Sequence, residues 1–575
     1  MQDYEETVSF LGSWGPFQRK VFFVLCATCV PAGSNLLSVI FLLATPPHHC
    51  HIPVQSNLSQ EWIQASIPVQ VAGQLGRSSC SRFELDQVKN LSAMGARPGP
   101  NWIQNQSVLL GSSPEVLIST LKQEACEDGW TYSTEYFQST VVTEFDLVCS
   151  EQWKQPLTSF VYFLGGLCGC FISGQLSDRF GRKPVLFGSV AVLTVFSSAL
   201  AFAPSWSVFT LLFFLLGLGQ ITCYIASFVL GSEILVGSTR ILFCSLCLNF
   251  VYVVSMMLLP ATAYVVRSWR HLSLMMATPG LACIPLWWMI PESPRWLVSR
   301  GRWQEADLVL RSAALENRVE APQVIFPTAK TEKTESQEEQ SLNFLDLLKT
   351  ANIRRITIKL WLIWISNSIS YFGLSFNMST IYGNPFLNYI LLTAVELPGY
   401  FASWLATRNF PRRLSFISFA LLGSLALLFM QFTIDSHPAI TMALVLLGKF
   451  GVLAGVGVLY VYSGELSPTV IRNTAMSSCA MFSRMGSSVS PYLLEMAVFY
   501  PLLPWIIVGA LSFLSVLLCI FLPETFRQPL PDTIQQVSLT QSFRCPWRSK
   551  APLKDEEKSA KEQSTTVEVI CTTHF

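Results

Sequence analysis

The chain has 575 residues, of which only 13% are charged and 51% are hydrophobic, and its net charge is +1. A soluble protein of this length would divide into several domains, but so few charges and so many long apolar runs indicate a membrane protein instead. The near-zero net charge gives no basis for a nucleic-acid partner. The sequence shows no catalytic or metal-binding constellation, so we expect neither an enzyme nor a metalloprotein.

Twelve apolar runs are predicted to cross a bilayer as helices, which takes roughly 20 residues each. The first run is too long, and its N-terminal flank too acidic, for a cleaved signal peptide. The predicted spans lie at about residues 21–44, 156–176, 184–204, 207–229, 241–265, 271–290, 356–377, 386–407, 414–434, 438–462, 474–497 and 501–523. The predicted fold class is therefore an all-α membrane protein.

A set of charged residues occurs twice, each time where an apolar run ends. Glu233 and Glu465 lie 232 residues apart, and so do Glu292 and Glu524. Two parallel copies of a six-helix unit explain this repeat, and such repeats are typical of secondary transporters.

Basic residues of the short loops all fall on one side of the predicted membrane, which is then cytoplasmic. We expect a multi-pass protein of the plasma membrane with both termini in the cytoplasm. The predicted divisions are a cytoplasmic N-terminus (1–20), an N-terminal half (21–290) with an extracellular loop (45–155), a cytoplasmic linker (291–355), a C-terminal half (356–523) and a cytoplasmic tail (524–575).

The extracellular loop holds an even number of cysteines in an oxidising compartment, which predicts two disulfides among Cys50, Cys80, Cys126 and Cys149. Three pairings are possible. Glycosylation signals stand at Asn57, Asn90 and Asn105. At the other end of the chain, Thr573 and Phe575 fit a C-terminal ligand of a PDZ scaffold, although a chance match explains so short a pattern equally well.

The stretch Gly174-Gln-Leu-Ser-Asp-Arg-Phe-Gly-Arg-Lys183 lies between the second and third predicted spans. It resembles the signature loop of the major facilitator superfamily, which implies twelve transmembrane helices in two six-helix halves. A plain stop signal would explain the basic residues but not the aspartate and the glycines. We expect Asp178 to pair across the interface between the halves, and Gly174 and Gly181 to allow close helix approach. The predicted gating residues are Asp178, Arg179, Arg182, Lys183, Glu233, Arg240, Glu292, Arg295, Glu465 and Arg472.

Two further stretches narrow the resemblance. They are Phe10-Leu11-Gly12-Ser13-Trp14-Gly15-Pro16-Phe17-Gln18-Arg19 near the N-terminus and Pro291-Glu292-Ser293-Pro294-Arg295-Trp296-Leu297 after the sixth predicted span. Both stretches are similar to solute carrier family 22. Within that family, the stretches Ile172–Lys183, Tyr460–Tyr462 and Pro529–Ile534 most resemble the carnitine/organic cation (OCTN) branch. The resemblance covers about residues 1–535. It implies uniport, exchange or sodium-coupled uptake of small organic ions, carnitine among them.

Three ionisable residues lie near the middle of predicted spans, all in the C-terminal half: Glu396, Lys449 and Arg484. Such residues are costly in a membrane and mark functional sites. Glu396 and Lys449 lie at similar depth, so we predict that they pair and leave Arg484 for an anionic group, whose carboxylate its planar fork suits. Alternatively, Arg484 itself pairs with Glu396 and Lys449 is left over.

A quaternary ammonium group needs aromatic faces, which hold it by cation–π attraction. The candidate aromatic residues are Tyr224, Tyr252, Tyr371, Phe372, Tyr460 and Tyr462, of which the resemblance favours the first three. The chain departs from the family pattern at Ala32 and Cys223, where carnitine transporters carry asparagines. Gln220 and Asn249 are the remaining candidate oxygen ligands of a coupling sodium ion, and no other cofactor is expected.

These observations predict a secondary transporter of small organic cations or zwitterions that works by alternating access. The alternatives are an organic anion transporter, in which Arg484 dominates, and a non-transporting receptor or scaffold. An intact signature loop and a midplane arginine favour transport, because a receptor needs neither.

Overall fold

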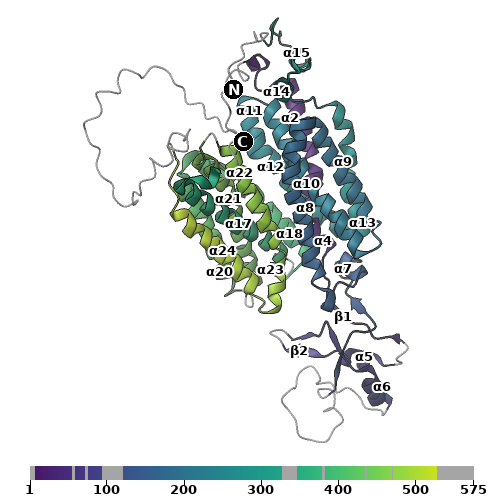
Figure 1. Cartoon of the computed structure of the whole chain (residues 1–575). Coiled ribbons are helices and arrows are strands. Elements are labelled where there is room, and N and C mark those ends of the chain that lie inside the picture. The colour runs from purple at the N-terminus through teal and green to yellow at the C-terminus, as the bar shows by residue number, and fades with distance from the viewer. Residues whose placement is uncertain are drawn as a thin grey trace, which may run out of the picture.

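The computed structural model describes residues 7–54, 58–71, 75–93, 121–326, 346–378, 383–433, 437–468 and 471–526. Two bundles of long helices lie side by side, and a small domain with short strands projects from one end of the N-terminal bundle (Figure 1). We call this end the loop side. The opposite end, which carries α14 and α15, is called the linker side.

The N-terminal bundle is built from six helical segments, of which two are interrupted. The first segment breaks at Cys29, next to Pro31, because proline lacks the N–H that would continue the helix. The fifth contains a turn of π-helix, Phe243–Cys247. The segments are α2 (Pro16–Thr28) with α3 (Val30–Leu36) and α4 (Ser38–Leu42), α8 (Lys154–Phe180), α9 (Arg182–Leu200), α10 (Trp206–Ile234), α11 (Gly237–Leu242) with α12 (Leu248–Val265), and α13 (Trp269–Ala282).

The C-terminal bundle repeats this arrangement with a break in its second segment. That segment is interrupted at Val395, directly before Glu396. The segments are α17 (Ala351–Asn377), α18 (Pro385–Ala394) with α19 (Glu396–Asn409), α20 (Arg412–Met430), α21 (Pro438–Leu466), α22 (Arg472–Val489) followed by α23 (Tyr492–Glu495), and α24 (Leu503–Ile520).

Within the described residues, nine helical segments are long and apolar enough to cross a membrane, whereas the sequence predicted twelve. The other three predicted spans are also helical, as α13, α17 and α22. α13 has only 14 residues. α17 and α22 fall short because serines, asparagines and Arg484 dilute their apolar residues, as expected of helices that face a polar interior rather than lipid.

The small domain on the loop side consists of three two-stranded antiparallel sheets and short helices. β1 (His48–Cys50) pairs with β6 (Trp130–Tyr132), β2 (Val69–Val71) with β3 (Leu75–Arg77), and β4 (Ser81–Phe83) with β5 (Gln123–Ala125). The short helices are α5 (Gln60–Ala65), α6 (Leu85–Ala93) and α7 (Val141–Glu144). The four loop cysteines form the disulfides Cys50–Cys126 and Cys80–Cys149, which resolves the choice among three pairings.

The linker side carries the helices α14 (Pro294–Ser299), α15 (Trp303–Asn317) and α16 (Asp346–Lys349). The end of α15 is attached to the start of the first span. Oδ1 of Asn317 accepts a hydrogen bond from the Phe17 amide at 2.9 Å, and Nζ of Lys20 lies 2.5 Å from Oε2 of Glu316. The segment between the halves is thus anchored on the N-terminal bundle.

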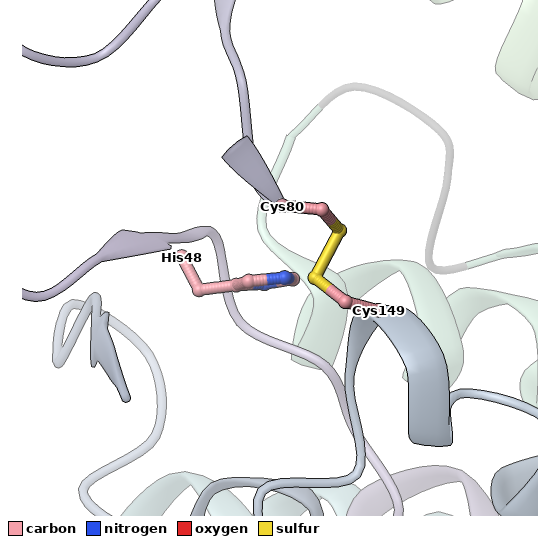
Figure 2. A group of neighbouring side chains, drawn as sticks. All are labelled: His48, Cys80 and Cys149. Atoms are coloured by element: carbon pink, nitrogen blue, oxygen red, sulfur yellow. A yellow bond between two sulfur atoms is a disulfide. The ribbon is translucent and has the colours of Figure 1, made fainter. Parts of the chain in front are cut away.

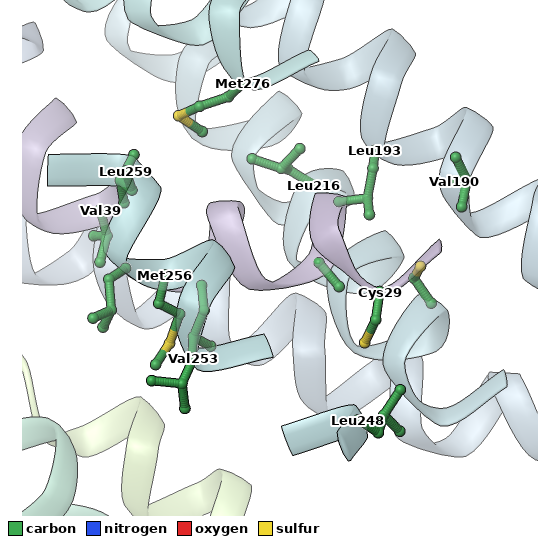
Figure 3. Close-up of a cluster of buried hydrophobic side chains, with 14 of the residues drawn as sticks. Cys29, Val39, Val190, Leu193, Leu216, Leu248, Val253, Met256, Leu259 and Met276 are labelled. Carbon is green, nitrogen blue, oxygen red and sulfur yellow. The ribbon is translucent and has the colours of Figure 1, made fainter. Parts of the chain in front are cut away.

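Small residues let the helices of the N-terminal bundle pack closely. A Cβ on Gly165 of α8 would lie 2.1 Å from the carbonyl oxygen of Phe214, and one on Gly217 of α10 would lie 2.1 Å from that of Tyr162. Such close approach matters in a bilayer, where lipid is as apolar as the side chains and packing must hold helices together. Buried side chains such as Leu193 and Leu216 fill the space between these helices (Figure 3).

The sequence prediction for Gly174 was wrong. A Cβ there would meet no atom within 4 Å, because the residue lies on a face of α8 with no neighbouring helix. Gly181, by contrast, has a positive φ of 108°, and a Cβ on it would lie 2.5 Å from Oε2 of Glu292. Gly181 therefore makes room for the Glu292 side chain and not for a neighbouring helix, whereas Gly165 allows the close helix approach that was expected of Gly174.

The two halves meet along α8 with α22 and along α12 with α18. On the loop side their contact is aromatic. The Phe386 ring of α18 lies 5.8 Å from Phe41 and 5.6 Å from Tyr264, both in the N-terminal half. It also lies 6.5 Å from Tyr136 and 5.3 Å from Phe137. We call these five residues the aromatic plug; it closes the loop side between the halves.

Candidate functional site

The candidate site lies where polar helices of the C-terminal half face the N-terminal half. α22 places Arg484 against α8, where the guanidinium is within hydrogen-bonding reach of the Cys170 thiol. The same guanidinium interacts electrostatically with Tyr162 of α8, Tyr252 of α12 and Tyr460 of α21. Arg484 therefore bridges the two halves.

Within the described residues, no carboxylate pairs with Arg484. The neighbouring Ser487 and Ser488 hydroxyls donate to the Arg484 carbonyl oxygen and not to a group that could balance the guanidinium charge. A guanidinium without a carboxylate partner lacks the anion that would balance its charge. The arrangement suits a carboxylate, which can accept two parallel N–H bonds from the arginine fork.

Glu396 and Lys449 form the ion pair that the sequence predicted. Nζ of Lys449 lies 3.2 Å from Oε1 of Glu396, and both side chains are only 1% exposed. Nζ also donates to the Ser375 hydroxyl at 3.0 Å, while the Tyr371 hydroxyl donates to Oε1 of Glu396 at 2.6 Å. Because Glu396 opens α19, the positive end of that helix further stabilises its carboxylate. The alternative pairing of Arg484 with Glu396 does not occur here.

The Lys449 ammonium group also lies over the ring of Tyr371. Its Nζ lies 3.2 Å from the centre of that ring, in a cation–π contact. One face of Tyr371 is therefore already occupied by an ammonium group from the protein itself. This placement weakens the prediction that Tyr371 holds the cationic part of a substrate, and it assigns the residue to the Glu396–Lys449 pair.

Tyr224 and Tyr252 form an oriented pair between α10 and α12. Their rings meet edge to face at 5.1 Å. The Tyr224 hydroxyl donates to Oδ1 of Asn249 at 2.9 Å, and Nε2 of Gln220 donates to the Tyr252 hydroxyl at 2.7 Å. Gln220 and Asn249, the predicted sodium ligands, thus both hold the tyrosine pair.

The remaining predicted aromatic residues divide between two environments. Tyr460 is 43% exposed and interacts electrostatically with Arg484, so it joins the site. Tyr462 is fully buried and donates to the Pro523 carbonyl, since residues two apart on a helix point in different directions. Phe372 packs edge to face on Phe163 at 4.9 Å, as part of the contact between the halves. Tyr462 and Phe372 therefore lie outside the site that surrounds Arg484.

Sequence reasoning missed several residues of this site. Tyr162 and Cys170 look like ordinary apolar residues of a span, and only the packing of α8 on α22 brings them to Arg484. Tyr400 of α19 lies within electrostatic reach of Glu396, Tyr371 and Tyr224. Its spacing of four residues from Glu396 places both on one helix face, and that signal was available in the sequence.

On the linker side, the N-terminal half builds a network around Arg182. Nη2 of Arg182 lies 3.0 Å from Oε1 of Glu233, and its backbone amide donates to Oε1 of Glu292 at 3.0 Å. The Ser293 hydroxyl donates to Oε2 of Glu233 at 2.5 Å. Nη1 of Arg182 also lies 2.5 Å from Oδ1 of Asp178.

The C-terminal half builds the same network around Arg412. Nη2 of Arg412 lies 3.1 Å from Oε1 of Glu465, its amide donates to Oε1 of Glu524 at 2.8 Å, and the Thr525 hydroxyl donates to Oε2 of Glu465 at 2.6 Å. The charged repeat read from the sequence is thus a repeat of contacts as well.

The expected contact of Asp178 across the interface is not what the structure shows. Asp178 pairs with Arg182, one helical turn further along its own half. The Arg182 and Arg412 networks likewise each connect residues of a single half.

The other predicted gating residues lie around these networks. Nε of Arg472 donates to the Gly464 carbonyl at 2.9 Å, and the Arg179 guanidinium lies 5.6 Å from the centre of the Phe180 ring. Nζ of Lys183 lies 4.6 Å from the Trp287 ring centre, and its backbone amide donates to Glu292. Arg240 and Arg295 also interact with neighbouring groups.

Of the glycosylation signals, Asn90 is exposed on α6. Asn57, Asn105 and the predicted PDZ ligand, Thr573 and Phe575, lie outside the described residues.

Comparison with known proteins places this geometry among transporters. A family model described as "Sugar (and other) transporter" matches residues 118–535. The chain is 42% identical to "Solute carrier family 22 member 4" of Mus musculus, with 98% of this chain and 99% of the relative covered. It is 44% identical to "Organic cation/carnitine transporter 2" of Homo sapiens, with coverage of 93% and 94%.

Among solved structures, the inward-open xylose transporter XylE from E. coli superposes with a TM-score of 0.56 at 13% identity, with 91% of this chain and 99% of that one covered. At this identity the likeness shows the fold of the two helical bundles and nothing of the substrate.

Proposed function

The chain belongs to solute carrier family 22 of the major facilitator superfamily, in its organic cation and carnitine transporter branch, and we propose that it carries small organic cations and zwitterions such as carnitine. It is a multi-pass membrane protein. The observation that carries the proposal is the Arg484 guanidinium, which bridges the two halves with no carboxylate partner among the described residues.

The proposed pose of a zwitterion follows from the two kinds of group around Arg484. A substrate carboxylate accepts hydrogen bonds from the guanidinium, and the quaternary ammonium lies against the rings of Tyr224, Tyr252, Tyr400 and Tyr460. Each cation–π contact adds roughly 0.5–2 kcal/mol. Tyr371 acts indirectly in this proposal, because Lys449 already covers one face of its ring.

We further propose that the structure is the inward-facing member of an alternating-access cycle in the plasma membrane, with the linker side in the cytoplasm. The aromatic plug closes the loop side, while the Arg182 and Arg412 networks stay within their own halves. Opening of the loop side would separate Phe386 from Phe41 and bring the linker-side networks together, so that Asp178 and its neighbours can form contacts between the halves.

Sodium coupling is a separate proposal, with Gln220 and Asn249 as the oxygen ligands. Both side chains lie beside the tyrosine pair. Oδ1 of Asn249 already accepts a hydrogen bond from Tyr224, so a sodium ion would share this oxygen. Replacement of sodium by a large organic cation in the uptake buffer tests the coupling directly.

Further proposals concern the parts of the chain that face the two aqueous compartments. Asn90, exposed on α6, is the proposed glycosylation site within the described residues, with Asn57 and Asn105 as further candidates. A PDZ scaffold at Thr573 and Phe575 stays a proposal from sequence. We propose no catalytic activity for the chain.

The experiment that tests the transport proposal is uptake into vesicles that contain the purified protein. Labelled carnitine, tetraethylammonium and a monocarboxylate anion are compared, each with and without sodium. The variant Arg484→Ala is expected to reduce the kcat/KM of carnitine uptake about 30-fold or more, because a charge-assisted hydrogen bond contributes about 2 kcal/mol. Tetraethylammonium uptake should fall much less, since this cation has no carboxylate.

Met485→Ala is the matched control, because Met485 is adjacent on α22 but points away from Arg484 and is 44% exposed. Unchanged carnitine uptake in Arg484→Ala would refute the proposed site. Uptake of the monocarboxylate alone would favour the organic anion transporter, and failure of all three solutes to move would favour a receptor or scaffold.

A further inference from the structure

The Cys80–Cys149 disulfide lies beside the imidazole of His48, away from the transport site. Figure 2 shows the nitrogen-bearing end of the His48 ring pointing toward the two sulfur atoms. One ring nitrogen and both sulfurs lie within 4.8 Å of one another. His48 comes from β1 and Cys149 from the start of the second span, so the group joins the small domain to the membrane helices.

The hydrogen bond made by Nδ1 determines which ring nitrogen of His48 is free to act as a base. Nδ1 of His48 lies 3.1 Å from the Pro46 carbonyl oxygen, and a carbonyl can only accept, so Nδ1 carries the proton. The neutral ring then keeps its lone pair on Nε2. The ring is held in place by Tyr132, whose ring centre lies 5.7 Å away.

The second disulfide of the loop, Cys50–Cys126, differs from Cys80–Cys149 in its exposure to solvent. Cys50 is 0% exposed and Cys126 is 9% exposed, whereas Cys80 is exposed to solvent. A thiol from solution can therefore approach Cys80 more easily than the buried Cys50. Accessibility and a nearby base are the two factors that speed attack on a disulfide.

The backbone at Cys149 also favours opening of this bond. Cys149 has a φ of +56°, a left-handed conformation that costs a residue with a side chain free energy. Its sulfur tethers the residues directly before α8, the helix that packs against α22 and Arg484.

We propose that Cys80–Cys149 is a thiol–disulfide exchange site for low-molecular-weight thiols, with His48 as its base. Nε2 of His48 takes the proton of an incoming thiol, and the resulting thiolate attacks Sγ of Cys80. The S–S bond breaks, the electron pair leaves on Sγ of Cys149, and the imidazolium returns the proton to that sulfur. A second thiol then displaces Cys80 from the mixed disulfide, so that two thiols are oxidised to one disulfide and two cysteine thiols are formed.

The test measures how fast each disulfide of the full-length protein opens in β-mercaptoethanol, by differential alkylation and mass spectrometry of the four cysteines. We expect Cys80–Cys149 to open at least about tenfold faster than Cys50–Cys126. His48→Ala should slow the faster reaction about tenfold or more, in line with the contribution of a general base. Added free imidazole should restore part of the lost rate, which a purely structural role of His48 would not allow.

His51→Ala is the matched control, because His51 follows the same strand and its Nδ1 contacts Thr131 instead of a disulfide. Its rates should equal those of the unmodified protein. Equal opening rates of the two disulfides, or an unchanged rate in His48→Ala, would overturn the proposal. His48→Ala could instead loosen the loop, so that both disulfides open faster. In that case the proposal is judged by the unmodified protein, in which a ratio near one between the opening rates of Cys80–Cys149 and Cys50–Cys126 overturns it.

Discussion

Removal of one partner of the buried Glu396–Lys449 pair is expected to destabilise the protein strongly. At the observed 3.2 Å, the attraction of two unit charges at an effective dielectric constant of 20 is about 5 kcal/mol. Glu396→Gln would leave the Lys449 ammonium buried without its counter-charge, and such losses cost about 3–5 kcal/mol. For a chain of this size, that corresponds to a fall in Tm of about 2–4 °C.

The double variant, Glu396→Gln with Lys449→Gln, separates the charge pair from simple packing. It leaves no buried charge, so we expect it to recover most of the stability that either single variant loses. Lys359→Gln is the matched control, because Nζ of Lys359 donates to the Phe521 carbonyl at 3.0 Å near the helix ends and lies over the ring of the same residue, and no carboxylate pairs with it among the described residues. Thermal unfolding in detergent gives the Tm of the unmodified protein, the two single variants, the double variant and the control. Losses in the two single variants that simply add in the double variant would refute the reasoning.

Two further predictions concern packing and pH. Gly165→Ala should destabilise the protein by about 1–3 kcal/mol, because its Cβ would lie 2.1 Å from the Phe214 carbonyl oxygen. Gly174→Ala on the same helix should change the stability little. Equal Tm values for the two variants would contradict this prediction. Hydrogen bonding from Arg270 holds the pKa of Glu144 below its ordinary value, so the stability from this contact is full above that value and is lost as pH falls through the lowered pKa. The difference in Tm between the unmodified protein and Glu144→Gln should therefore shrink below about pH 4, and a difference that grows on acidification would refute the assignment.

The sequence predicted those features that depend on position along the chain. Glu233 and Glu465 mark the ends of equivalent helices, so their offset was enough to expect equivalent contacts, and both accept bonds from an arginine in the structure. Glu396 and Lys449 lie at matching depth in their spans, and depth follows directly from counting residues along a helix. Depth alone left Arg484 as an alternative partner of Glu396, and the structure pairs Glu396 with Lys449.

Features that depend on how each helix is rotated could not be predicted from one sequence. Tyr460 and Tyr462 are equally good candidates by depth, but only Tyr460 interacts electrostatically with Arg484, while Tyr462 points into its own half. Gly174 and Gly165 are both glycines of α8, and only the second faces a neighbouring helix. An apolar span carries little amphipathic signal, because lipid and protein interior are similarly apolar. The sequence of such a helix therefore does not show which of its faces points into the protein.

The pairing of Lys449 with Glu396 has a consequence for how the membrane voltage acts on the protein. Because these two charges cancel, the interior keeps one net positive charge, on Arg484. A bound zwitterion leaves this total unchanged. We therefore expect a membrane potential to act equally on the loaded and on the empty protein as the site changes sides. A bound organic cation raises the total by one, and each elementary charge that crosses the membrane field is subject to about 2.3 kcal/mol per 100 mV. Because the protein's own charges return to their starting positions in each cycle, the steady current measures the charge of the carried solute and of any coupled sodium ion.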